Sequence, residues 1–162
     1  ELLYTLGVRR SELIGIRDRD LDTNTRTVKI YGKGGKERLL PLLPSTVGLL
    51  KEYVDKRGVK FQTSSFSSLL VTDKGQELYP KFVYRKINDY LKGVSVKQKK
   101  SPHMIRHTFA THLLNRGADL NTVKELLGHS SLAATQVYTH SSIEELKMIY
   151  QSSHPRGNQS SS

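Results

Sequence analysis

The sequence contains no cysteine, which excludes disulfide bonds and zinc sites built on thiolates. It has no apolar run approaching the ~20 residues that cross a bilayer, and it opens on no signal peptide. Acidic residues are scarce beside basic ones, with 15 Asp and Glu against 26 Lys and Arg. Together these absences favour a soluble intracellular protein with a polyanionic partner.

The basic excess gives a net charge of +11 and an isoelectric point near 9.9. We expect the polyanion to be nucleic acid rather than an anionic membrane, because no basic helix carries a bulky apolar face. The 162 residues suffice for one domain with a core. The chain begins inside an apolar segment, Leu2–Tyr4, so we expect a fragment that lacks its N-terminal part.

Local patterns predict a mainly helical α+β fold with a small antiparallel sheet of two or three strands. The β-branched run 27–31 and the run 38–42 predict two strands joined by a glycine-rich hairpin turn at 32–36. Apolar periodicity, caps and glycine stops predict helices over 2–6, 11–16, 44–57, 80–91, 103–116, 119–127, 131–138 and 145–150. The polar, Ser-rich segment 154–162 predicts a disordered tail.

The stretch Ser101–His107 is the most informative part of the chain. Ser101 is a suitable N-cap, and Pro102 suits the first turn of a helix. His103, Arg106 and His107 then share a helix face near a positive helix end, which predicts an anion site.

Five cations and one phenol fall in turns, at helix ends or in polar contexts: Arg9, Lys33, His103, Arg106, His129 and Tyr138. Without a paired carboxylate, this set suits a phosphate better than a metal ion. Taken singly, several have a structural interpretation. Arg9 suits an ion pair with Glu12, His129 a helix C-cap, and Tyr138 packing at a helix end.

Two common motifs are absent. His103 and His107 have the spacing of helical zinc ligands, but no Glu follows the first His as in zinc proteases. The turn Gly32–Lys36 lacks the spacing and the Ser or Thr of a nucleotide-binding P-loop. We therefore expect neither a metal nor another cofactor.

Five motifs in order resemble the tyrosine recombinase/integrase family, and most of all the bacterial Xer-type recombinases. They are Gly7–Leu13, Gly32–Arg38, Ser101–His112, Leu126–Ser130 and Tyr138–His140. Further likeness to the Xer type lies in Ser142–Leu146 and His154–Arg156. The resemblance implies that residues 1–153 form the catalytic domain, and that an N-terminal DNA-clamping domain is absent from this chain.

The resemblance also implies roles for the six candidate residues. Tyr138 would be the nucleophile that forms a 3′-phosphotyrosine with cleaved DNA. Arg9, Arg106 and His129 would bind the phosphate oxygens. Lys33 would be the general acid for the leaving 5′ oxygen, and His103 the general base and acid for Tyr138. This chemistry needs cationic help, because only ~0.1% of free tyrosine is phenolate at neutral pH.

Other residues are assigned supporting roles. Glu12 resembles the family acid that buttresses the active site, and His107 is expected to support it structurally. Backbone-phosphate contacts, which add affinity without reading sequence, are predicted for five basic residues: Lys36, Arg38, Lys97, Lys99 and Lys100.

The family further implies a homo- or hetero-tetramer on a double-stranded recombination site, linked through the C-terminal helix. Leu146, Met148, Ile149 and Tyr150 would supply that contact or fold back in cis. A DNA translocase or accessory factor is a further candidate partner, no membrane is expected, and the site of action would be the nucleoid in the cytoplasm. Three alternatives stay open: a mobile-element integrase, a type IB topoisomerase-like enzyme and an inactive DNA-binding module. The fragment alone is expected to bind DNA weakly.

Overall fold

The computed structural model describes residues 1–63, 66–92, 101–128 and 140–154. Within these ranges it contains seven α-helices: α1 (Leu2–Leu6), α2 (Arg10–Gly15), α3 (Pro44–Phe61), α4 (Pro80–Leu91), α5 (Pro102–Asn115), α6 (Leu120–Leu127) and α7 (His140–Ser153). It also contains three strands: β1 (Leu21–Asp22), β2 (Thr27–Tyr31) and β3 (Glu37–Pro41). This mainly helical architecture with a small sheet confirms the predicted fold class.

The sheet is antiparallel in the order β1-β2-β3, with Ile30 of β2 opposite Arg38 of β3. The tip of the β2–β3 hairpin is a short 3-10 turn, Lys33–Gly35, in which Gly34 and Gly35 take positive φ. A β-carbon disfavours that backbone region, so glycine suits both positions. The hairpin and its turn agree with the sequence prediction.

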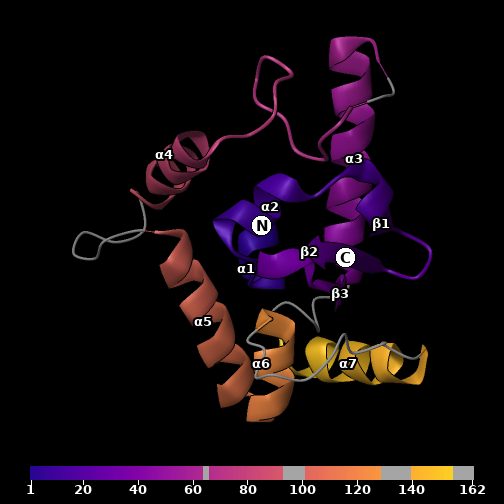
Figure 1. The fold of residues 1–162 in the computed structure, drawn as a ribbon, viewed down its shortest axis with the longest axis vertical. Coiled ribbons are helices and arrows are strands. Elements are labelled where there is room, and N and C mark those ends of the chain that lie inside the picture. The colour runs from indigo at the N-terminus through magenta and orange to yellow at the C-terminus, as the bar shows by residue number, and fades with distance from the viewer. Residues whose placement is uncertain (64–65, 93–100, 129–139, 155–162) are drawn as a thin grey trace.

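Helices α5, α6 and α7 lie together at one end of the molecule, and α3 and α4 project at the other (Figure 1). Helix α5 begins as predicted, with Pro102 in its first turn and the Ser101 hydroxyl accepting the Met104 amide at 3.3 Å. Its apolar face buries Phe109 and Leu113 against α1, α6 and α7. None of the helices described is long and apolar enough to cross a membrane.

Gly7 joins α1 to the turn that precedes α2, and it has φ +60°. A β-carbon at this position would overlap the ring of Phe109. The close approach of the backbone to that ring therefore requires glycine. It also fixes the start of the segment that carries Arg9.

Two helices are longer than predicted, α3 at its end and α7 at both ends. Helix α3 continues through Gly58 and ends at Phe61, where Gln62 takes the left-handed conformation. The Phe61 ring packs against Phe66 and against Gly75, so tertiary packing outweighs the roughly 1 kcal/mol that a helical glycine costs. Helix α7 begins at His140, ahead of the predicted start at Glu145.

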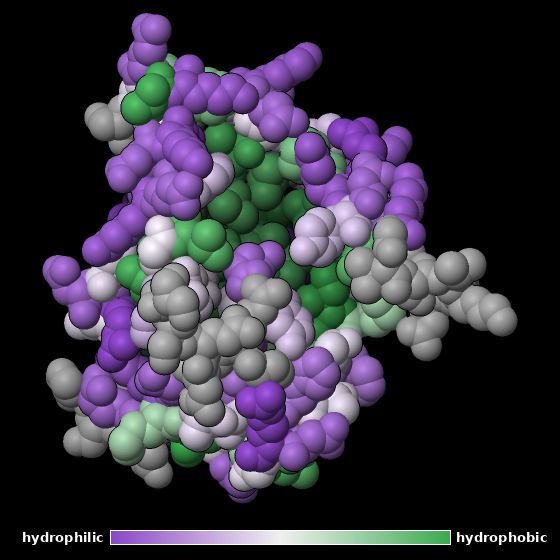
Figure 2. All heavy atoms as spheres, turned by 180° about the vertical axis from the view of Figure 1, so that it is seen from behind, coloured by the Kyte–Doolittle hydropathy of each residue, from purple (hydrophilic) through white to green (hydrophobic). Residues whose placement is uncertain are grey.

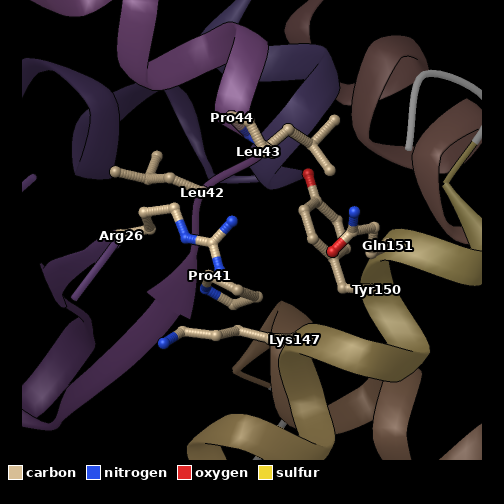
Figure 3. Close-up of a pocket in the computed structure, with 8 residues that line it drawn as sticks. All are labelled: Arg26, Pro41, Leu42, Leu43, Pro44, Lys147, Tyr150 and Gln151. Carbon is tan, nitrogen blue, oxygen red and sulfur yellow. The ribbon is translucent and has the colours of Figure 1, made fainter. Parts of the chain in front are cut away.

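Helix α7 packs in cis against β3 and α5. The ring of Tyr150 inserts beside the junction of β3 and α3, with its hydroxyl pointing toward Leu43 (Figure 3). Tyr150 is buried, whereas Met148 is exposed. Of the side chains predicted to contact a neighbouring subunit, Tyr150 is thus used within this chain.

His154 was predicted to begin a disordered tail, and this boundary is wrong. The side chain is 1% exposed and packs edge-on against Tyr4, with ring centroids 5.3 Å apart. It also contacts the rings of Phe109 and Tyr150. The predicted tail beyond it, 155–162, lies outside the described residues.

The reverse face of the molecule is hollowed between the α3 side and the α4 side, and apolar side chains gather in the hollow (Figure 2). Hydrophilic side chains frame it. The packed core is therefore not fully enclosed on this face.

Candidate active site

The site begins at the N-terminus of α2, where Glu12 folds back over the first turn. Its Oε2 accepts the Arg9 amide at 2.7 Å, and its Oε1 accepts Nη1 of Arg9 at 3.0 Å. A glutamate three residues into a helix commonly binds the N-cap amide in this way. The contact holds Arg9 at the edge of the site, with 39% of its side chain exposed.

Arg38 approaches the same carboxylate from β3. Its Nη1 and Nη2 donate to the two oxygens of Glu12 at 3.0 and 2.9 Å. Its Nε donates to the carbonyl of Leu126, at the end of α6, at 3.0 Å. This paired geometry on a carboxylate is the strong, directional form of an arginine ion pair.

Arg106 reaches the cluster from α5. Its Nη1 donates to the Gly7 carbonyl at 2.7 Å and lies 3.9 Å from Oε2 of Glu12. Its Nη2 donates to the Leu127 carbonyl at 2.5 Å. The guanidinium therefore ties the turn before Arg9 to the C-terminal end of α6.

Three guanidinium groups now surround one carboxylate. Burial raises the pKa of Glu12, but the hydrogen bonds from Arg38 and the Arg9 amide outweigh it and lower the pKa to about 2. Burial also lowers the pKa of Arg106 to about 10; the charges of Arg9 and Arg38 add to this effect, and Glu12 opposes it. Arg106 thus stays cationic at neutral pH, and it shares the Glu12 carboxylate with two further guanidiniums.

This imbalance gives the cluster its chemistry. One carboxylate cannot neutralise three buried or half-buried cations, so an added anion would be attracted to the site. Arg9 and Arg106 carry planar donor groups that suit the oxygens of a phosphate. The charge and geometry of the cluster therefore favour an anion such as a phosphate group.

The low pKa of Glu12 predicts a specific loss of stability in acid. A folded-state pKa of about 2 lies below the ordinary 4.5, so ionised Glu12 stabilises the fold above pH 4.5 and the contribution is lost toward pH 2. This shift corresponds to about 3 kcal/mol of unfolding free energy. In Glu12→Gln we expect that loss to disappear from urea unfolding curves measured between pH 5 and pH 2.

Glu77 supplies the matched control. Its pKa is also lowered to about 2, chiefly by a hydrogen bond from Arg17, but the carboxyl is exposed to solvent. Glu77→Gln is therefore expected to leave most of the acid dependence in place. If the unfolding free energy of Glu12→Gln still falls toward pH 2 as in the unaltered chain, the assignment to Glu12 is wrong.

Lys33, His103 and His107 are exposed, unlike Glu12, Arg38 and Arg106. Lys33 is exposed at the tip of the β2–β3 hairpin, and Lys36 is exposed beside it. A β-carbon on Gly32, at the base of this turn, would lie 3.8 Å from Oε1 of Glu12, so the hairpin rises from the cluster itself. On α5, His103 and His107 are exposed whereas Arg106 is buried.

Five predicted residues lie outside the described residues: Lys97, Lys99, Lys100, His129 and Tyr138. The described chain before His129 ends at Gly128, which has φ +66° and caps α6. The carbonyls of Leu126 and Leu127 at this end bind Arg38 and Arg106. The point at which the chain leaves α6 is therefore part of the cluster.

Arg38 corrects a sequence prediction. It was expected to contact DNA phosphates, but it is 7% exposed and its donors are bound to Glu12 and Leu126. Side chains alternate along a strand, so Arg38 shares a face with buried Leu40 and opposes buried Ile30. That alternation was the signal that could have identified it as an interior residue.

Comparison with known proteins places these features in a family. The chain matches the phage integrase family over residues 1–145. It is 45% identical over 160 residues to tyrosine recombinase XerC of Chlorobaculum parvum, a match that covers 96% of this chain and 48% of that protein.

Two solved recombinases share the fold. The crystal structure of XerA recombinase is 30% identical with a TM-score of 0.72, over 91% of this chain and 54% of that one. XerH recombinase, solved in a pre-cleavage complex with its difH substrate, is 32% identical with a TM-score of 0.66, over 89% and 42%. The chain spans about half the length of the relatives it matches.

Proposed function

The chain belongs to the phage integrase family, and from that premise we propose that it carries the active site of an Xer-type site-specific DNA recombinase. The reaction is metal-independent cleavage and religation of DNA through a covalent 3′-phosphotyrosine. The observation that carries the proposal is the cluster of Arg9, Arg38 and Arg106 around the single carboxylate of Glu12. A site with excess fixed positive charge stabilises the charge that develops on a phosphodiester under attack.

In the proposed reaction, Tyr138 Oη attacks the phosphorus, and the bond from phosphorus to the 5′ oxygen breaks. Arg9 and Arg106 bind the non-bridging oxygens, with His129 as a third donor. Lys33 gives a proton to the leaving 5′ oxygen, and His103 takes the proton of the phenol. The phosphotyrosine keeps the energy of the phosphodiester bond, so a new 5′-hydroxyl can reseal the strand without ATP.

The predicted partners follow from this reaction. XerH was solved bound to its recombination site, and we propose that this chain acts on duplex DNA in the same manner, within the cytoplasmic nucleoid. Lys36, Lys97, Lys99 and Lys100 would contact the DNA backbone. A tetramer joined through the C-terminal helix, and a translocase or accessory factor, belong to the same proposal.

A mobile-element integrase is the second candidate, because the matched family is that of phage integrases. The chemistry would be the same, and only the DNA sites would differ. A recombination assay on both kinds of DNA distinguishes the two. An Xer-type enzyme would recombine chromosomal sites, and a mobile-element integrase would recombine the ends of its element.

A suicide duplex with a nick beside the cleavage position tests the proposal at low salt. We expect a protein–DNA band that survives SDS, forms in EDTA, and is lost in Tyr138→Phe. A band that persists in Tyr138→Phe would assign the nucleophile elsewhere. A strict requirement for magnesium, or no band from the unaltered chain, would overturn the proposed function.

A further inference from the structure

Arg38 and Arg106 are both buried beside Glu12, whereas Arg9 is half-buried. Arg38 comes from β3, the outgoing strand of the hairpin that carries Lys33. Its Nε, Nη1 and Nη2 all donate to Leu126 or Glu12, so it has few donors left for a substrate. Its position between three elements nevertheless gives it a role that neither of the other arginines has.

One side of the guanidinium fixes the carboxylate. Both oxygens of Glu12 are bound by Arg38, at 3.0 and 2.9 Å, which sets the plane of the carboxylate. The same oxygens bind the amide and the guanidinium of Arg9, and Oε2 lies 3.9 Å from Arg106. A rotation of the carboxylate would therefore move the two arginines that face the phosphate.

The other side of the guanidinium fixes the end of α6. Its Nε binds the Leu126 carbonyl, and its face packs on Gly128, where a β-carbon would lie 2.8 Å from Nη1. His129, the candidate third phosphate donor, follows Gly128 directly in the sequence. Arg38 thus joins the hairpin of Lys33, the carboxylate behind Arg9 and Arg106, and the segment that leads to His129.

We infer that Arg38 is a positioning residue for strand cleavage, holding Glu12 and the end of α6 in the geometry that aims the phosphate-binding groups. The inference rests on the proposed function. It differs from a purely structural role because Arg38 acts on the charge state of Glu12 as well as on its place.

The pH dependence of cleavage separates these two roles. In the described part of the chain, the charged groups that face Glu12 are Arg9 from the N-terminus of α2, Arg38 from β3 and Arg106 from α5. The hydrogen bond from Arg38 is the foremost influence that lowers the pKa of Glu12. Without it Glu12 would take up a proton at a higher pH, and cleavage would weaken at that pH.

Arg38→Lys and Arg38→Gln are the test variants, and Arg10→Gln is the matched control. Arg10 is exposed next to Arg9, so its replacement removes a charge near the site without touching Glu12. Cleavage of the suicide duplex is measured in single turnover at saturating DNA from pH 3 to 8. DNA affinity and thermal unfolding are measured on the same samples.

We expect Arg38→Lys to cleave about 10²-fold more slowly with unchanged DNA affinity, because one ammonium cannot bind both carboxylate oxygens and the Leu126 carbonyl. The acid limb due to Glu12 lies near pH 2 in the unaltered chain. In Arg38→Gln it should move up by about one pH unit or more and so enter the measured range. Arg38→Lys keeps the charge and can be measured below its melting temperature even where Arg38→Gln does not fold.

The outcomes distinguish the inference from the proposed function. An adduct from the unaltered chain and from Arg10→Gln, with Arg38→Lys equal to them in rate and pH profile, overturns the inference alone. The inference is also overturned if the Arg38 variants lose rate equally at every pH, in proportion to the fraction of unfolded protein, and the acid limb does not move. No adduct from the unaltered chain overturns the proposed function and the inference together.

Discussion

Arg106→Ala is expected to slow formation of the protein–DNA adduct by roughly 10³-fold or more. One well-placed arginine contributes about 10³ to 10⁵ to the rate of phosphoryl transfer. Arg106 is held for this task by the carbonyls of Gly7 and Leu127, at 2.7 and 2.5 Å. Single-turnover cleavage of the nicked duplex at saturating DNA gives the rate directly.

The same substitution also removes a buried structural group, so its effect on the fold has to be measured separately. Two carbonyls lose their donor, and each unsatisfied group costs about 1–3 kcal/mol. Arg106→Lys keeps the charge but cannot bridge both carbonyls, and it should lose most of the rate with a smaller loss of stability. Arg19→Ala, at an exposed arginine away from the cluster, serves as the control. A rate for folded Arg106→Ala within tenfold of the control would show that Arg106 only supports the fold.

Lys33→Ala is expected to reduce cleavage by about 10²- to 10⁴-fold, the usual contribution of a general acid. The side chain is exposed at the hairpin tip, so the fold should hardly change. A bridging 5′-sulfur substrate should restore the rate, because a thiolate leaves without a proton far more readily than an alkoxide. The rates of adduct formation on the oxygen and sulfur substrates are compared at one pH.

Lys36→Ala is the control on the same hairpin. As a proposed backbone contact it should weaken DNA binding in a salt-dependent way, with the same loss on both substrates. If sulfur fails to rescue Lys33→Ala, or rescues Lys36→Ala as well, then Lys33 is not the proton donor.

The secondary structure was largely predictable because its signals are local. The hairpin glycines, the Ser101 cap and the Asp119 cap each act within a few residues, and each was found where expected. Gly58 and His154 were misread for the opposite reason. Contacts between residues distant in sequence determine the structure at both positions. The Phe61 ring packs on Gly75 and extends the helix past Gly58, and Tyr4 packs against His154.

Three members of the charged cluster were predictable from the sequence, but the way in which the cluster is built was not. Arg9, Glu12 and Arg106 were selected by motif, although Arg106 binds a carbonyl 99 positions away in the chain. No local pattern indicated that the end of α6 would supply carbonyls to two arginines. Arg38 was misassigned because its charge was given more weight than its place in a strand.

Gly7 has a consequence for attempts to retarget or stabilise such a protein. Its backbone lies against the Phe109 ring of α5, and its carbonyl accepts a hydrogen bond from Arg106. Arg106 lies on α5 as well, about one turn before Phe109. A change of side-chain volume at position 109 would therefore shift the guanidinium that we propose binds the scissile phosphate. In a directed-evolution library, substitutions at positions 7 and 109 would have to be selected jointly, and screened for turnover rather than for expression alone.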